Sequence, residues 1–156
     1  DFHFPDTDSN TVSISDSRYR GKVTVVQILG TWCPNCMDET VFLADYYKQH
    51  HAEGLEMIGL CFERSPDYSA AVKNLRRLKD RYKLEYPLLF AGQANKDTVM
   101  KKLEGLKNFI SFPSTLFINR DGEVVKVYTG FNGPATGDAY EQYKADFDKT
   151  VRALLK

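Results

Sequence analysis

Cys33 and Cys36 are the residues of this sequence whose type and spacing are best suited to chemistry. Two thiols separated by two residues can close a small disulfide and reopen it, which suits redox exchange. Residues 23–29 form a short apolar, β-branched run before the pair, and apolar residues at helical spacing come after it. We therefore expect the pair to lie where a strand ends and a helix begins.

The start of a helix gives the two cysteines different roles. The first backbone N–H groups of a helix lack partners and the helix dipole is positive there, which stabilises a thiolate on Cys33. We expect Cys33 to be the nucleophile. Cys36, one turn into the helix and less exposed, would then resolve the mixed disulfide by attacking Cys33. Pro34 fits the first helical turn, where its missing N–H costs nothing.

Two other interpretations of the pair are open: half of a zinc site, or an inert disulfide. A structural zinc site needs about four nitrogen or sulfur ligands. The other candidate ligands form no second pair; they are Cys61, His3, His50 and His51. We interpret Cys61 as an inert residue buried in a strand and the adjacent histidines as a solvated helix end.

The order of strand, Trp32, cysteine pair and helix is similar to the thioredoxin superfamily. Within it, residues 30–36, Gly-Thr-Trp-Cys-Pro-Asn-Cys, most resemble the TlpA/ResA-like thiol-disulfide oxidoreductases. The resemblance implies an α/β protein with the thioredoxin fold, a three-layer α/β/α sandwich with a mixed central sheet, an N-terminal hairpin and a strand-helix insertion. We expect a single domain over residues 1–156, with a loosely ordered leading segment at 1–10.

The sequence pattern places the remaining elements. Helices are predicted after the motif, with Met37, Val41 and Ala44 inward, and from the N-cap Ser65 with Pro66 as the first helical residue. Further helices are predicted from about residue 96, with an apolar face that includes Leu106, and from the capping-box pair Asp138 and Glu141. Strands are predicted at 11–15, 55–62, 85–90, 116–119 and 123–128, and we interpret 85–106 as the insertion.

The resemblance also implies a substrate groove around the cysteines. Pro113, at the head of a strand, resembles the superfamily's cis-proline, although the usual Gly-x-Pro-Thr is replaced here by Ser-Phe-Pro-Ser at 111–114. We expect Phe112, Pro113 and Gly130 to line the groove with Trp32 and Pro34.

Proton transfer at Cys36 needs a titratable neighbour. Gln27 occupies the place on the motif strand where related thioredoxins carry a buried acid, and an amide cannot titrate. The resemblance implies a carboxylate at the end of the next strand, and Glu63 stands near that place. Glu63 could instead be an ordinary exposed carboxylate, with Arg64 at the matched position.

Composition narrows the range of partners. Lys plus Arg and Asp plus Glu each total 21, so no net charge draws the chain to nucleic acid or to an anionic membrane. No stretch approaches the roughly 20 apolar residues of a membrane span. The first residues are not a signal peptide, so we expect a processed or trimmed chain. The helix predicted from Ser65 has a basic face made of Lys73, Arg76, Arg77, Lys79 and Arg81. We interpret this face as solvated, and binding to an acidic partner is the alternative.

We therefore expect a disulfide reductase that acts on extracytoplasmic proteins, is re-reduced by an upstream protein, and needs no cofactor beyond its Cys33–Cys36 disulfide. The resemblance implies a bacterial, periplasmic or otherwise extracytoplasmic monomer, anchored in a membrane only through a segment outside this sequence.

A non-catalytic thioredoxin-like binding module is one alternative, and a peroxiredoxin-like peroxidase is another. The peroxidase needs a threonine three residues before its cysteine, where Gly30 stands. A copper-delivery protein needs Cys-x-x-x-Cys and a downstream histidine, and the last histidine is His51.

Overall fold

A five-stranded mixed sheet with strand order β5-β4-β3-β6-β7 forms the middle layer of the computed structural model, which describes residues 1–103 and 111–156. β3 is parallel to β4 and antiparallel to β6, so the motif strand is central. The strands of this sheet are β3 Val23–Leu29, β4 Leu55–Glu63, β5 Leu88–Gln93, β6 Ser114–Ile118 and β7 Val124–Thr129. The helices are α1 Pro34–His50, α2 Tyr68–Tyr82, α3 Lys96–Lys102 and α4 Asp138–Leu155, with short 3-10 turns at His51–Glu53 and Pro134–Thr136.

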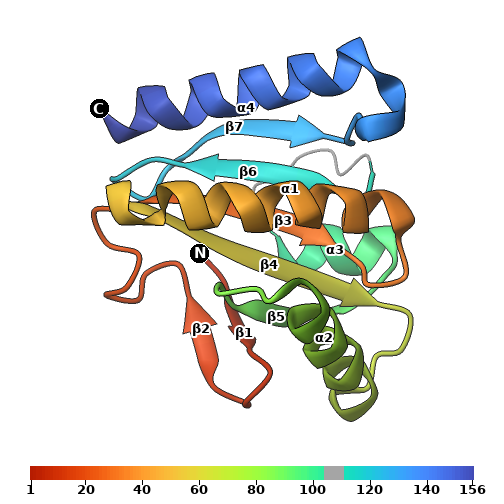
Figure 1. Ribbon diagram of the computed structural model, residues 1–156. Coiled ribbons are helices and arrows are strands. Elements are labelled where there is room, and N and C mark those ends of the chain that lie inside the picture. Colours follow the sequence, from red (N-terminus) through yellow and green to blue (C-terminus); the bar gives the residue numbers. More distant parts are fainter. Residues whose placement is uncertain (104–110) are drawn as a thin grey trace.

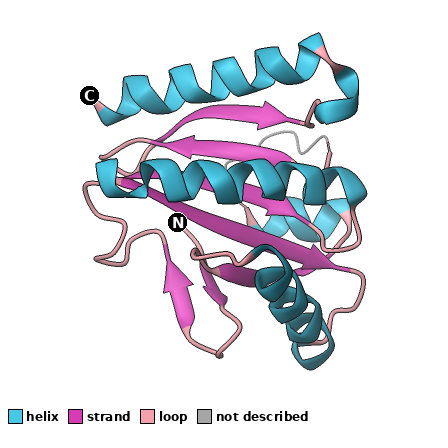
Figure 2. Ribbon diagram, viewed as in Figure 1, coloured by secondary structure: helices cyan, strands magenta, loops and turns pink. Residues whose placement is uncertain are grey.

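Both faces of the sheet are covered, which explains why every residue of β3 and β4 is buried. Val25 faces a core built with α1, α2 and α4, whereas its neighbour Val26 faces a second core built with α3 and the N-terminal hairpin. In Figures 1 and 2 the strands accordingly form a central layer with helices over it. This arrangement confirms the predicted three-layer thioredoxin fold.

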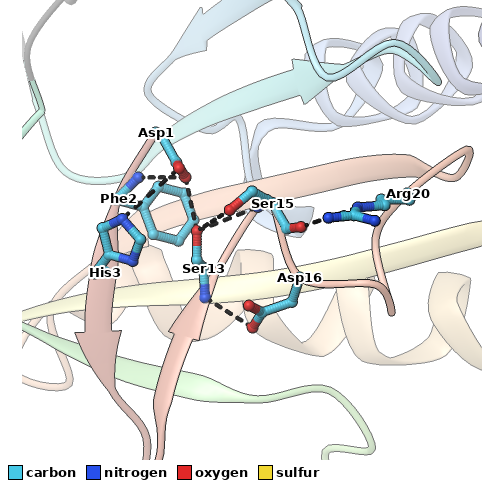
Figure 3. A network of polar contacts seen from close by, with 7 residues as sticks. All are labelled: Asp1, Phe2, His3, Ser13, Ser15, Asp16 and Arg20. Carbon is cyan, nitrogen blue, oxygen red and sulfur yellow. Dashed lines mark hydrogen bonds and ion pairs between the residues drawn. The ribbon is translucent and has the colours of Figure 1, made fainter.

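The first ten residues are held more firmly than the sequence suggested. β1 His3–Pro5 pairs antiparallel with β2 Thr11–Ser13, which confirms the expected hairpin. Phe2 and Phe4 are each only 8% exposed, because they pack into the second core. Polar contacts secure the same end of the chain, as Figure 3 shows: the Asp1 carboxylate accepts from the Ser13 hydroxyl at 2.7 Å.

The predictions for α1 and α2 need correction. Val41 is 50% exposed, because the buried side of α1 carries Glu39 and Thr40 instead. α2 begins at Tyr68 and is capped by Asp67, whose carboxylate accepts from the N–H of Ala70, so Ser65 and Pro66 lie before the helix.

The start of α4 and the bounds of the insertion also differ in detail from the sequence prediction. α4 begins at Asp138 after Gly137, whose φ of 61° favours glycine, and no side chain caps it. The insertion is present as β5, an edge strand after Pro87, followed by α3. Leu106, predicted on the apolar face of this helix, lies outside the described residues.

Candidate active site

Cys33 and Cys36 lie at the start of α1, directly after the central strand β3, as the sequence predicted. Cys33 is the N-cap residue, and its sulfur accepts a hydrogen bond from the N–H of Cys36 at 3.3 Å. This N–H is one of the free donors at the helix start, and it would stabilise a negative sulfur. Cys33 is 7% exposed and Cys36 is 0% exposed, so of these two residues only Cys33 keeps some exposed surface.

The Cys36 thiol is deeply buried. Burial raises the pKa of Cys36 far above its ordinary value, and the hydrogen bond with Cys33 raises it further. The Cys36 carbonyl accepts from Gln27 Nε2 at 3.2 Å and from Thr40 Oγ1 at 2.8 Å, which fixes this turn of the helix against the sheet. Because a thiol in this setting resists ionisation, its attack on Cys33 requires a nearby proton acceptor.

Glu39, which the sequence analysis missed, is a buried carboxylate one helical turn after Cys36. Residues three apart share a helix face, and the negative charge of Glu39 is one of the causes that raise the pKa of Cys36. Glu39 Oε2 accepts from the Tyr143 hydroxyl at 2.6 Å and from Thr115 Oγ1 at 3.0 Å. Oε1 is buried without a hydrogen-bond partner among the described residues.

The environment of Glu39 holds its pKa near neutrality. Burial raises this pKa from 4.5 to about 7, while the hydrogen bonds from Tyr143 and Thr115 act in the opposite direction. A group with this pKa can accept or release a proton at neutral pH. The spacing from Cys36 was the available signal, but an isolated glutamate on a helix is ordinarily read as solvated.

Glu63, the carboxylate that the sequence favoured, is also buried, at 1% exposure, so its interpretation as an exposed charge is wrong. It accepts from the N–H of Thr31 at 2.8 Å, from the Thr31 hydroxyl, and from Asn74 Nδ2 at 3.5 Å. These bonds tie the end of β4 to the residue before Trp32. Burial is the main cause that raises the pKa of both Cys36 and Cys61, and the charge of Glu39 adds to it at Cys36 as the charge of Glu63 does at Cys61.

The expected groove residues come together at the same end of the sheet. The Phe112–Pro113 bond is cis, and Ser114, the first residue of β6, pairs with Ile28 near the end of β3. Gly130 donates its N–H to the Pro113 carbonyl at 2.8 Å. The Phe112 ring meets the edge of Trp32 at a centroid distance of 5.2 Å.

Trp32 and its neighbours shape the surface around Cys33. The indole Nε1 donates to the Phe62 carbonyl at 2.9 Å and so anchors the ring over the end of β4. A Cβ added at Gly30 would lie 2.2 Å from that nitrogen, which requires glycine at this position. Pro34 is exposed beside Cys33, and Asn35 Nδ2 donates to the Phe131 carbonyl at 3.0 Å.

Within residues 1–103 and 111–156, no group of three His, Cys, Asp or Glu side chains is placed to hold a metal ion. None of the helices in these ranges is both long enough and apolar enough to cross a membrane.

Comparisons with known proteins agree with this arrangement. The model of the Redoxin family matches residues 1–143. Thiol-disulfide oxidoreductase ResA of Bacillus subtilis (strain 168) is 30% identical over 129 residues, which cover 83% of this chain and 64% of that protein. ResA of Halalkalibacterium halodurans is 29% identical over 118 residues, 76% of this chain and 60% of its own. The chain thus spans less than two thirds of the length of these curated relatives.

Solved structures show the same fold. A thiol:disulfide interchange protein of the thioredoxin family from Chlorobium tepidum TLS superposes with a TM-score of 0.71 at 22% identity, covering 99% of this chain and 93% of that one. StoA from Bacillus subtilis gives a TM-score of 0.61 at 19% identity, with 92% and 93% covered.

Proposed function

The chain belongs to the Redoxin family, and we propose that it is a thiol-disulfide oxidoreductase that reduces protein disulfides through Cys33 and Cys36. The observation that carries the proposal is the helix-capping Cys33, whose sulfur accepts the N–H of a buried Cys36, with the acid Glu39 one turn further on. Nucleophile, resolving thiol and proton acceptor therefore lie on consecutive turns of one helix.

The first step is attack by the Cys33 thiolate on one sulfur of the substrate disulfide. The substrate S–S bond breaks, a Cys33–substrate disulfide forms, and the other substrate sulfur leaves as a thiolate that takes a proton from water. The N–H of Cys36 holds the Cys33 sulfur in place for this attack. Trp32 and Phe112, in edge contact beside it, provide apolar surface for the substrate chain.

The second step depends on Glu39. Its carboxylate takes the proton of the Cys36 thiol, and the resulting thiolate attacks Cys33, which closes the Cys33–Cys36 disulfide and releases the second substrate sulfur. The released sulfur takes a proton from water, while the Cys33 proton has gone to solvent and the Cys36 proton to Glu39. The dithiol has then passed two electrons to the substrate. An upstream protein reductant must return them. Glu39 takes the role that the sequence analysis gave to Glu63, because Glu39 shares the helix face of Cys36.

The cellular setting is part of the proposal. Resemblance to ResA-like proteins supports a bacterial enzyme that acts on proteins outside the cytoplasm. The peroxidase alternative gains no support, since the threonine it requires would replace Gly30, where a Cβ collides with the Trp32 ring.

The test mixes the reduced protein with a short peptide that carries an intramolecular disulfide and follows both by mass spectrometry. We expect the wild-type protein to lose two hydrogens as the peptide gains two. Cys36→Ala should accumulate the mixed disulfide, Cys33→Ala should not react, and the buried control Cys61→Ala should behave as wild type. A wild-type protein that leaves the peptide oxidised would instead indicate a non-catalytic binding module.

A further inference from the structure

A small pocket of about 150 Å³ lies beside the cysteine motif, between the start of α1 and the middle of α2. On the motif side it is lined by Thr31 and Met37, which flank the two cysteines in sequence. On the α2 side it is lined by Asn74, Arg77, Leu78 and Arg81. The pocket therefore adjoins the residues that come before and after the cysteine motif.

The two arginines give this pocket a positive charge. Arg77 and Arg81 are one turn apart on the same helix face, both are exposed, and neither is paired with a carboxylate in the described part of the chain. Arg76 differs, because it donates to the Thr7 carbonyl at 2.7 Å and lies 3.7 Å from Asp8. Its charge meets a carboxylate within the fold, whereas Arg77 contacts Asn74 and Arg81 lies over the Tyr82 ring.

A line of contacts connects Arg77 to the motif. Arg77 Nη1 donates to Asn74 Oδ1 at 3.4 Å, and Asn74 Nδ2 donates to the Glu63 carboxylate at 3.5 Å. Glu63 in turn accepts from Thr31, so the guanidinium is held at the rim of the pocket next to the cysteines. A third cation, Arg64, lies 5.2 Å above the Trp32 ring.

The acidic groups nearby do not neutralise this surface. Glu63 is buried and already accepts from Thr31 and Asn74. Asp38 is exposed, but it lies beside Gly133. Asp80 is exposed on α2 without an ion pair within the described ranges.

We propose that the pocket formed by Thr31, Met37, Asn74, Arg77, Leu78 and Arg81 binds an acidic side chain of the partner protein, next to the disulfide that Cys33 attacks. The inference rests on the proposed function and specifies its substrate class. Arginine presents a planar fork of donors that matches a carboxylate, and charges at an interface rim act mainly on association rate and partner choice. On this proposal Arg77 and Arg81, two residues of the basic face of α2, form a specificity surface.

The experiment uses three peptides with the same intramolecular disulfide that differ only in two residues beside one cysteine: Asp, Asn or Lys. The reduced protein is mixed with each peptide in a stopped-flow instrument, and Trp32, the sole tryptophan, reports oxidation of the neighbouring pair. We expect the Asp peptide to react roughly fivefold faster than the Asn peptide at low salt and the Lys peptide to react slowest. In 0.5 M NaCl the three rates should converge, since salt screens exposed charges.

Two double variants test whether the preference for the Asp peptide depends on the pocket. Arg77→Gln with Arg81→Gln should abolish the preference for Asp while leaving the rate for the Asn peptide unchanged. Lys73→Gln with Lys79→Gln removes two charges from the same helix outside the pocket and should keep the preference.

Equal rates for the three peptides, or an equal loss of preference in both double variants, would overturn the pocket assignment while the proposed function stands. If none of the peptides is reduced, the proposed function fails and this inference fails with it.

Discussion

Replacing Glu39 by Gln removes the charge that the proposed resolving step depends on and keeps the size of the side chain. The pKa of Glu39 is raised from 4.5 to about 7 by burial, so the folded state binds this proton more tightly than the unfolded state. The stabilisation is therefore fully present below the unfolded pKa of 4.5 and is lost as the pH rises through about 7. At about 1.4 kcal/mol per pKa unit, the wild-type protein loses about 3 kcal/mol over this range through Glu39 alone.

The Glu39→Gln variant should not show this pH-dependent loss of stability, because an amide does not ionise. We expect the free energy of unfolding of the variant, relative to wild type, to improve by about 3 kcal/mol between pH 4.5 and pH 8.5. Urea unfolding of both proteins, kept reduced with a phosphine, measures this difference. Asp38→Asn, an exposed carboxylate on the same helix, is the control and should change little. A gap between wild type and Glu39→Gln that stays constant with pH would refute the raised pKa.

Glu39→Gln also tests the proposed role of Glu39 in resolving the mixed disulfide. In wild type, the resolution of the mixed disulfide should accelerate with pH as a group of pKa near 7 loses its proton, and Glu39→Gln should slow this step roughly 100-fold and remove that dependence. Initial attack by Cys33 should be unaffected. Resolution at the wild-type rate with an unchanged pH profile would mean that solvent, not Glu39, accepts the Cys36 proton.

Three other predictions concern the rest of the site. Iodoacetamide at neutral pH should label reduced Cys33 well before Cys36 and the third cysteine, because only the first has exposed surface; equal labelling in peptide maps would contradict the assigned roles. Gly30→Ala should destabilise the fold by about 2 kcal/mol or shift Trp32, since the new Cβ meets the indole at 2.2 Å; unchanged unfolding and tryptophan emission would disprove this packing. Glu63→Gln should lower stability by about 2 kcal/mol without moving the pH profile of resolution, and a moved profile would return the role of base to Glu63.

The architecture could be predicted because the sequence signals for it are local. Apolar runs at 23–29 and 55–62 indicated strands, and the structure has β3 and β4 there, with every residue buried. The cysteine pair, with Pro34 after its first member, indicated the start of a helix, where α1 begins. In each case the residues that determine the element are neighbours in the chain.

The acid of the site could not be predicted in the same way, because its partners are far away in sequence. A helix face with Glu39 and Thr40 reads as solvated, so the apolar pattern placed Val41 inward instead. The face becomes buried only when Thr115 of β6 and Tyr143 of α4 fold over it and supply hydroxyl donors. A buried carboxylate is tolerable where such donors satisfy it.

On the proposed mechanism, this dependence on distant elements lets Glu39 serve disulfide exchange in either direction. Burial alone would drive the pKa of Glu39 upward and keep it protonated, and the donors Tyr143 and Thr115 pull it back to about 7. At that value the acid is about half ionised at neutral pH, so it can take the proton of Cys36 when the disulfide closes and return it when an upstream reductant opens the disulfide. Because the donors come from β6 and α4 while the cysteines are on α1, the proton affinity at the site depends on the packing of α4 against the sheet.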